Sequence, residues 1–244
     1  MLSKLVLQLE ADNDINAFSG AVFHGLIMDL ISSGDADYLH EQNRNPFSQY
    51  LRRKEGRLYW TINGLNAYAY ENIIKKLLAV NEIELKQKDK KLHILDIKLN
   101  RFPRKQFIAE SLFPDDNYLF PISFLTPTAF KSNGEYYFFP DIRLIFQSLM
   151  NKIESTGDEQ VFDLEVLNML ADSLKIDRYY LASKYFSVKG NRISSFSGAI
   201  RLKLYKNFDL YGMINMLLKF GEFSGVGIKT SMGMGAIGLG RETV

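Results

Sequence analysis

The sequence contains no cysteine among its 244 residues and only three histidines. Disulfide bonds, thiolate metal sites and a cysteine nucleophile are therefore excluded, and a reducing compartment fits this composition. The histidines form no H-E-x-x-H pairing, so a zinc site has little support. No apolar run approaches the ~20 residues of a transmembrane helix, and residues 1–10 alternate like a strand instead of resembling a signal peptide. We expect a cytoplasmic protein with no cofactor, no metal and no membrane contact.

A large net charge is also lacking, because the formal value is only +2. Overall electrostatics therefore do not indicate nucleic-acid binding, and any attraction must come from local clusters of basic residues. Each cluster alone is typical of a solvated surface. The clusters are Arg44, Arg52, Arg53, Lys54 and Arg57; Lys86, Lys88, Lys90 and Lys91; Arg101, Arg104 and Lys105; and Lys184, Lys189, Arg192, Arg201, Lys203 and Lys206.

Glycine is concentrated near one end, since residues 221–240 hold seven of the 17 glycines. Backbone N–H groups that no side chain shields can converge on phosphate oxygens, and Lys229 adds a full charge. A nucleotide P-loop is disfavoured because Ile228 separates Gly227 from Lys229, and a dinucleotide fingerprint would need a helix after the glycines. A flexible connection is the alternative. The residues predicted to contact a phosphate-rich ligand are Gly225, Gly227, Lys229, Thr230 and Ser231.

The hydrophobic pattern repeats the order β-α-β-β-α-β, which predicts an α+β protein of two tandem ferredoxin-like units. Turn-forming residues near position 115 predict units at 1–115 and 116–244. In the first unit, Asp14 is expected to cap a helix over residues 15–31. In the second, we expect a helix over 158–175 and a hairpin of strands 185–188 and 199–205. The glycine loop then joins the last helix, 208–220, to the last strand, 236–239.

Two imidazoles and a cation suffice to cleave RNA without a metal ion. A base takes the proton of a ribose 2′-OH, an acid protonates the departing 5′-oxygen, and a cation stabilises the pentavalent phosphate. The products are a 2′,3′-cyclic phosphate and a 5′-OH. His40, which follows the first helix, is the better candidate, whereas His24 could equally be a core residue. His93 lies in a lysine-rich strand and is interpreted as structural or merely exposed.

Three segments carry a resemblance to a known family. They are Tyr38-Leu39-His40-Glu41 followed by Asn45-Pro46-Phe47; Phe124-x-Thr126-Pro127-Thr128-x-Phe130-Lys131; and Gly225-Val226-Gly227-Ile228-Lys229 up to Gly235. Over essentially its whole length the chain resembles the CRISPR-associated repeat-cleaving endoribonucleases, the "Cas six" group of RAMP proteins. It is most similar to those that serve type III-A systems.

The resemblance implies metal-independent cleavage of CRISPR precursor RNA within its repeats, with His40, His24 and Lys54 as catalytic residues. It also implies RNA binding through residues on or beside the second unit's hairpin and through Lys131, which follows Thr126-Pro127-Thr128; the basic run of the first unit adds further candidates. Together these residues are Arg52, Arg53, Lys131, Lys184, Lys189, Arg192, Arg201 and Lys203. The expected partners are repeat RNA and, transiently, a type III-A effector complex, for a monomer or homodimer. The alternative is a non-catalytic RNA-binding subunit of an interference complex.

Overall fold

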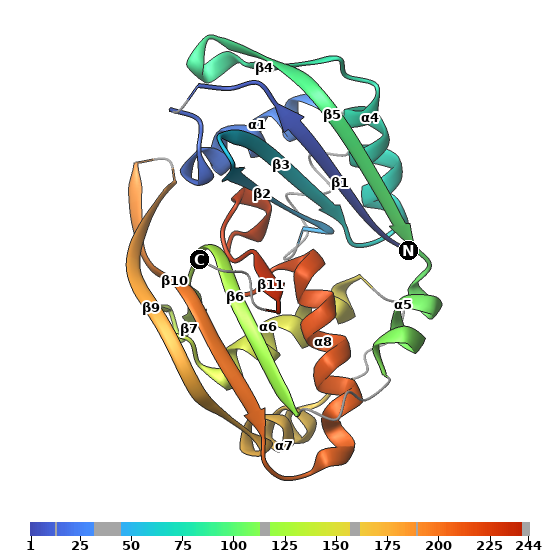
Figure 1. The fold of residues 1–244 in the computed structure, drawn as a ribbon, viewed down its shortest axis with the longest axis vertical. Helices are drawn as coiled ribbons and strands as arrows, with labels where there is room; N and C mark the ends of the chain where they lie inside the picture. Colours follow the sequence, from blue (N-terminus) through green and yellow to red (C-terminus); the bar gives the residue numbers. More distant parts are fainter. Residues whose placement is uncertain (13, 32–44, 113–117, 157–161, 189, 241–244) are drawn as a thin grey trace. The chain divides into compact units, whose positions relative to one another are not determined.

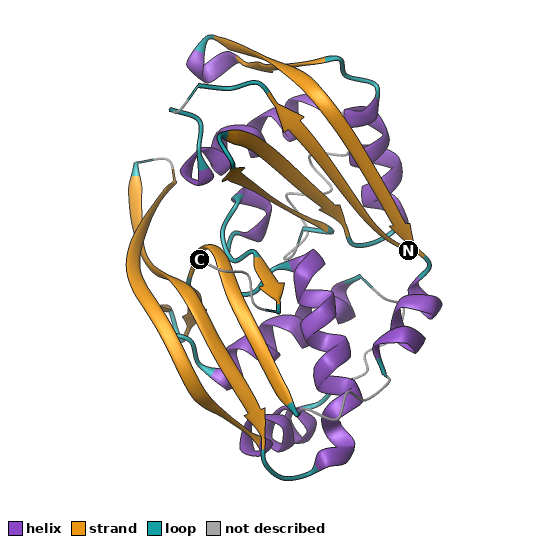
Figure 2. Ribbon diagram, in the orientation of Figure 1, coloured by secondary structure: helices purple, strands orange, loops and turns teal. Residues whose placement is uncertain are grey.

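The computed structural model describes residues 1–12, 14–31, 45–112, 118–156, 162–188 and 190–240. Within that part the chain forms two compact units. Unit 1 comprises Met1–Phe102 and Lys229–Gly233, and unit 2 comprises Pro103–Ile228 and the residues from Met234 onward. Each unit contains an antiparallel sheet with helices (Figures 1 and 2), so the α+β class is confirmed. The boundary predicted near residue 115 falls outside the described residues.

Unit 1 follows the order strand, helix, two strands, helix, two strands. Its strands are β1 (Leu2–Leu9), β2 (Phe47–Lys54), β3 (Arg57–Gly64), β4 (Glu82–Leu85) and β5 (Lys90–Phe102). Its helical segments are η1 (Ala17–Ser19), α1 (Gly20–Leu30), α3 (Ala67–Ala69), the π-helical η2 (Tyr70–Ile74), α4 (Lys75–Leu78), η3 (Lys86–Lys88) and η5 (Thr230–Met232). The sheet order is β2-β3-β1-β5-β4, with β1 between β3 and β5.

Alternation along β1 explains the core of unit 1. Leu5, Leu7 and Leu9 are buried, whereas the residues between them are only partly covered. Because successive side chains in a strand point to opposite faces, the leucines make one apolar face. Phe23 of α1 packs edge-on against Trp60 of β3 over that face, with ring centroids 4.8 Å apart. This packing fixes the position of α1 on the sheet.

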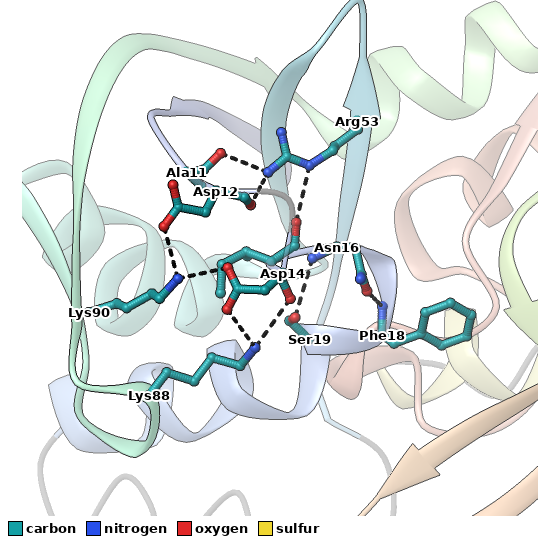
Figure 3. A network of polar contacts seen from close by, with 10 residues as sticks. Ala11, Asp12, Asp14, Asn16, Phe18, Ser19, Arg53, Lys88 and Lys90 are labelled. Carbon is teal, nitrogen blue, oxygen red and sulfur yellow. Dashed lines mark hydrogen bonds and ion pairs between the residues drawn. The ribbon is translucent and has the colours of Figure 1, made fainter.

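The start of the first helix differs from the prediction. Asn16, not Asp14, is the cap: its side chain accepts a hydrogen bond from the Phe18 amide at 2.9 Å, and the Asn16 amide in turn donates to Ser19 Oγ at 3.3 Å. Asp14 instead binds Lys90 Nζ at 2.7 Å (Figure 3), and this hydrogen bond lowers the pKa of Asp14. Asn competes equally well for the capping position, so the prediction of Asp14 was wrong.

Unit 2 has a four-stranded sheet in the order β11-β6-β10-β9 and a separate two-stranded ribbon, β7-β8. Its strands are β6 (Leu119–Thr128), β7 (Phe130–Ser132), β8 (Glu135–Tyr137), β9 (Leu174–Val188), β10 (Asn191–Leu204) and β11 (Ile237–Leu239). Its helical segments are α5 (Arg104–Ser111), α6 (Ile142–Ser155), α7 (Leu164–Ser173), η4 (Phe208–Leu210) and α8 (Tyr211–Ser224).

The hairpin of unit 2 is much longer than predicted. β9 already begins at Leu174, where the sequence had predicted a helix continuing to residue 175, and β9 pairs with β10 along nearly its whole length. The helix before it is correspondingly short, and Asp163 caps it by accepting from the Val166 amide at 2.9 Å. Most of β9 is exposed, so the apolar alternation that marks a half-buried strand is missing.

Candidate catalytic and RNA-binding residues

His24 lies on α1 with its imidazole half-buried against β2. Its ring stacks on that of Phe47, with centroids 5.8 Å apart and planes inclined by 12°. Nδ1 lies 3.1 Å from the backbone carbonyl oxygen of Ser231. A carbonyl oxygen can only accept a hydrogen bond, so Nδ1 must carry the proton. Nε2 is therefore the nitrogen that can take up a proton when the ring is neutral and donate one when it is charged.

The segment Lys229–Gly233 belongs to unit 1, although both of its flanks belong to unit 2. Its contact with α1 is so close that a Cβ on Gly20 would lie 2.3 Å from the Met232 carbonyl oxygen. Gly233, at φ +99°, adopts a conformation that disfavours other residues. Gly20 and Gly233 thus allow this segment to pack closely against the helix that carries His24.

The predicted phosphate cradle is wrong for the first two glycines of the loop. Gly227 donates its amide to Ser148 Oγ at 2.8 Å, and the Gly225 amide donates to the Gly221 carbonyl at 2.8 Å. Gly227 also approaches Ala129 so closely that a Cβ would lie 2.2 Å from the Ala129 oxygen. These amides are occupied by protein acceptors, and the glycines allow backbone segments to pack together.

The three polar residues after these glycines differ from one another. Ser231 is buried, and its hydroxyl accepts from Asn45 Nδ2 at 2.9 Å, so a direct contact of its side chain with RNA is not supported. Lys229 and Thr230 are half-buried. Lys229 has a left-handed backbone with φ of +52°, which costs a non-glycine residue on the order of 1–2 kcal/mol. Among the described residues, no side chain binds its ammonium group.

Of the remaining catalytic candidates, Lys54 does not join His24, and the structure does not address His40. His40 lies outside the described residues. Lys54 is exposed at the far end of β2, seven residues beyond Phe47. At about 3.3 Å per residue the two Cα atoms are roughly 23 Å apart, so Lys54 does not share a site with His24. His93 is exposed on β5, and its Nδ1 lies 3.6 Å from Glu82. The sequence did not show how far along its strand Lys54 lies from His24. The prediction of Lys54 as a catalytic partner of His24 is therefore corrected.

Arg53 holds the protein chain rather than presenting a free cation. Its Nε donates to the Ile15 carbonyl at 3.2 Å, and its Nη atoms donate to the carbonyls of Ala11, Asp12 and Gly56. Figure 3 shows the guanidinium donating to backbone carbonyls of the segment that leads into the first helix. The prediction that Arg53 binds RNA is therefore not supported. Arg52, next to it on β2, is half-buried and has partners of its own.

Unit 2 presents exposed cations and exposed aromatic rings. Lys131, Lys184, Arg192 and Lys203 are exposed, and Lys189 lies outside the described residues. Arg201 is different, because it forms a two-pronged ion pair with Asp177 at 2.9 and 2.6 Å. That pairing lowers the pKa of Asp177 and engages the Nε and one Nη of the guanidinium, so Arg201 is held by the protein itself, unlike the four exposed cations.

Several aromatic residues of unit 2 expose much of their surface. Tyr179 and Tyr180 on β9 are 69% and 67% exposed, and the run Tyr136–Phe139 is exposed throughout. The Arg192 guanidinium lies over the Tyr185 ring, 4.4 Å from its centre. Exposed rings beside cations suit the stacking of unpaired bases. β8, which carries Tyr136 and Tyr137, pairs only with the short strand β7, so these two rings are not enclosed by a larger sheet.

Two polar residues near His24 were not among the predicted site residues. Asn45 lies in a segment already singled out, and Gln49 is a fully buried amide on β2. The available signal was the alternation of Phe47, Gln49 and Leu51, which places a polar amide on the core side of a strand.

Within the described residues, no cluster of three or more His, Asp and Glu side chains could hold a metal ion. In the same part of the chain, no helix combines the length and apolarity needed to cross a membrane.

Comparisons with known proteins identify the family. The model of the family "CRISPR-associated endoribonuclease Cas6" matches residues 122–237. Relatives of that name are 34% identical in Streptococcus thermophilus, over 89% of both chains, and 35% identical in Mycobacterium tuberculosis, over 97% of this chain and 77% of the relative.

Solved structures agree at the level of the fold. A Cas6 product complex has a TM-score of 0.82 at 21% identity, covering 98% of this chain and 99% of that one. Cas6 of Thermus thermophilus has a TM-score of 0.73 at 21% identity, covering 98% of each chain. From the identity and coverage of the sequence relatives, this chain belongs to the family of CRISPR-associated endoribonucleases named Cas6.

Proposed function

We propose that this enzyme cleaves CRISPR precursor RNA within its repeats without a metal ion, by attack of a ribose 2′-OH on the adjacent phosphate. The bond that breaks is P–O5′, so the products are a 2′,3′-cyclic phosphate and a 5′-OH. The observation that carries the proposal is the Nδ1 contact of His24 with the Ser231 carbonyl. It leaves Nε2 as the atom that transfers a proton to or from the RNA.

His40 is the proposed partner of His24 in the two proton transfers. In the sequence, His40 comes after α1, which carries His24, and before β2, which carries Phe47. One imidazole acts as base toward the 2′-OH and the other as acid toward the 5′-oxygen. Lys229, only two residues before the Ser231 carbonyl that binds His24, is the proposed cation for the phosphate backbone.

The second part of the proposal concerns RNA binding. Lys131, Lys184, Arg192 and Lys203 of unit 2 would contact phosphates, and the exposed tyrosines of β9 would stack on unpaired bases. Solved relatives include a product complex and a substrate mimic complex of Cas6. The corresponding ligand here is repeat RNA. We also propose that the enzyme contacts a type III-A effector complex transiently and that it is a monomer or a homodimer.

The finer description of the fold belongs to the same proposal. Each unit is interpreted as a ferredoxin-like β-α-β-β-α-β module, because the sheet orders β2-β3-β1-β5 and β11-β6-β10-β9 place the first and third strands at the centre. We place the catalytic histidines in the first module and the hairpin that binds RNA in the second.

The test is cleavage of the host's own repeat RNA in EDTA. Wild-type protein should give one mapped cut with a cyclic phosphate, and His24→Ala should slow single-turnover cleavage by about 10²- to 10⁴-fold, as expected for a lost proton transfer. His93→Ala is the matched control, because it removes an imidazole that lies on β5 and faces Glu82 of β4. Strict dependence on added metal ion, or full activity of His24→Ala, would contradict the proposal.

A further inference from the structure

A buried glutamine lies directly behind the contact between His24 and Ser231. Gln49 of β2 is only 1% exposed, and its amide makes three hydrogen bonds. Its Oε1 accepts from Trp60 Nε1 at 2.8 Å. Its Nε2 donates to the carbonyl of Gly20 at 2.8 Å and to the carbonyl of Ser231 at 3.1 Å. All the donors and acceptors in these three hydrogen bonds are buried. Turning the amide would leave buried polar groups without partners, so the observed orientation of Gln49 is strongly favoured.

Trp60 fixes which way the amide points. An indole N–H can only donate, so the atom of Gln49 that faces it must be the oxygen. The nitrogen then faces the two carbonyls, which can only accept. This orientation does not depend on telling nitrogen from oxygen in the coordinates, because the partners on both sides determine it.

The two carbonyls that Gln49 holds are the two that position His24. Gly20 lies one helical turn before His24, so its carbonyl is the acceptor for the His24 backbone amide in the helical pattern. The Ser231 carbonyl is the acceptor for His24 Nδ1. A carbonyl oxygen has two lone pairs, and Ser231 uses them for Gln49 and His24. Gln49 thus connects the backbone of His24 with the acceptor of its ring.

We infer that Gln49 is a positioning residue for RNA cleavage: it holds the Ser231 carbonyl where that carbonyl keeps the proton of His24 on Nδ1 and leaves Nε2 to act. The inference rests on the proposed function of His24. Gln49 does not touch the RNA. It acts through a backbone carbonyl that the chain supplies from residues 229–233, so the tautomer of His24 depends on a segment far away in the sequence.

The decisive measurement is the tautomer of His24 in the RNA-free protein. Correlation of ring nitrogens with ring protons by NMR distinguishes Nδ1–H from Nε2–H, and with three histidines His24→Ala assigns the signals. We expect Nδ1–H in the wild type. Gln49→Met, which keeps the side-chain length without donors, and Gln49→Glu, which keeps an acceptor for Trp60, should each give a mixture.

Cleavage provides the second readout. Both variants should slow single-turnover cleavage at saturating protein by roughly 10- to 100-fold, the size expected when a catalytic group is misplaced by about 1 Å. The dissociation constant for repeat RNA should stay within about twofold, because Gln49 is buried. Two variants are used so that one that fails to fold does not prevent the test.

Asn63→Leu is the matched control. Asn63 is another buried amide, on β3, and it donates to Ser48 Oγ at 3.0 Å rather than to the carbonyls that hold His24. It should leave both the tautomer and the rate unchanged. An unchanged tautomer in both Gln49 variants, or an equal loss of rate in Asn63→Leu, would overturn the inference. Full activity of His24→Ala would instead overturn the proposed function, while the tautomer measurement would still test Gln49.

Discussion

Substitution of Gly20 by alanine tests whether the contact between α1 and residues 229–233 controls catalysis. Inside a helix, alanine is normally more stable than glycine by about 1 kcal/mol. Here the added Cβ would lie 2.3 Å from the Met232 carbonyl oxygen, whereas ordinary contact begins at 3.4 Å. The segment must therefore retreat by roughly 1 Å, an overpacking that typically costs about 1–3 kcal/mol. The gain and the cost together predict a protein between unchanged and about 2 kcal/mol less stable.

The effect on catalysis should be larger than the effect on stability. Ser231 directly precedes Met232, and its carbonyl lies 3.1 Å from His24 Nδ1. A retreat of this size takes the pair beyond hydrogen-bonding distance, so we expect single-turnover cleavage to fall by roughly 10- to 100-fold. Ala21→Gly is the control, because it lowers helix stability by about 1 kcal/mol and adds no atom.

The assays are single-turnover cleavage at saturating protein and urea unfolding of the same preparations. If Gly20→Ala cleaves at the wild-type rate and gains about 1 kcal/mol of stability, the close approach does not exist as described. If Ala21→Gly slows cleavage as much as Gly20→Ala does, helix stability rather than the position of Ser231 controls the rate.

Three further outcomes are expected. Lys229→Ala should weaken RNA binding more than it slows cleavage of bound RNA, and it should reduce the slope of log affinity against log salt by about 1; equal binding with slow cleavage would contradict this. Arg53→Ala should lower the urea midpoint with little change in RNA affinity, because its donors bind backbone carbonyls; a loss of affinity without a loss of stability would restore it as an RNA contact. The pKa of Asp177 is lowered by Arg201, so its contribution to stability is present above the ordinary carboxyl range and is lost as pH falls from about 4 through the lowered pKa. Urea unfolding of Asp177→Asn should therefore differ from wild type at pH 7 and converge with it near pH 2; a constant difference would show that charge is not the cause.

Much of the fold could be predicted from local patterns. The alternation of leucines in β1 and the turn at Gly56 are local signals, and they indicate the strands of unit 1. β9 could not be delimited in this way, because Tyr179, Tyr180 and Lys184 leave it without an apolar face. An exposed edge strand is held by its backbone pairing with β10, which the side-chain pattern does not record.

Of the residues that form the candidate site, the sequence allowed only the titratable one, His24, to be predicted. His24 could be named because imidazole chemistry is specific to the residue type. Its partner is a backbone carbonyl 207 positions away, which has no signature in the sequence. The glycines are also ambiguous in the sequence. A glycine is expected where a backbone amide faces a phosphate, and equally where two backbone segments pack closely together. In Gly227 the structure shows the close approach.

The order in which the chain is synthesised gives residues 229–233 a further consequence. Unit 1 is not continuous in sequence, and its last five residues follow almost the whole of unit 2. On the ribosome, the partner carbonyl of His24 does not exist until more than two hundred residues after His24 have been made. A nascent chain that has already folded its first sheet therefore still lacks the group that fixes its histidine. The role proposed for His24 therefore requires residues that are made late in synthesis.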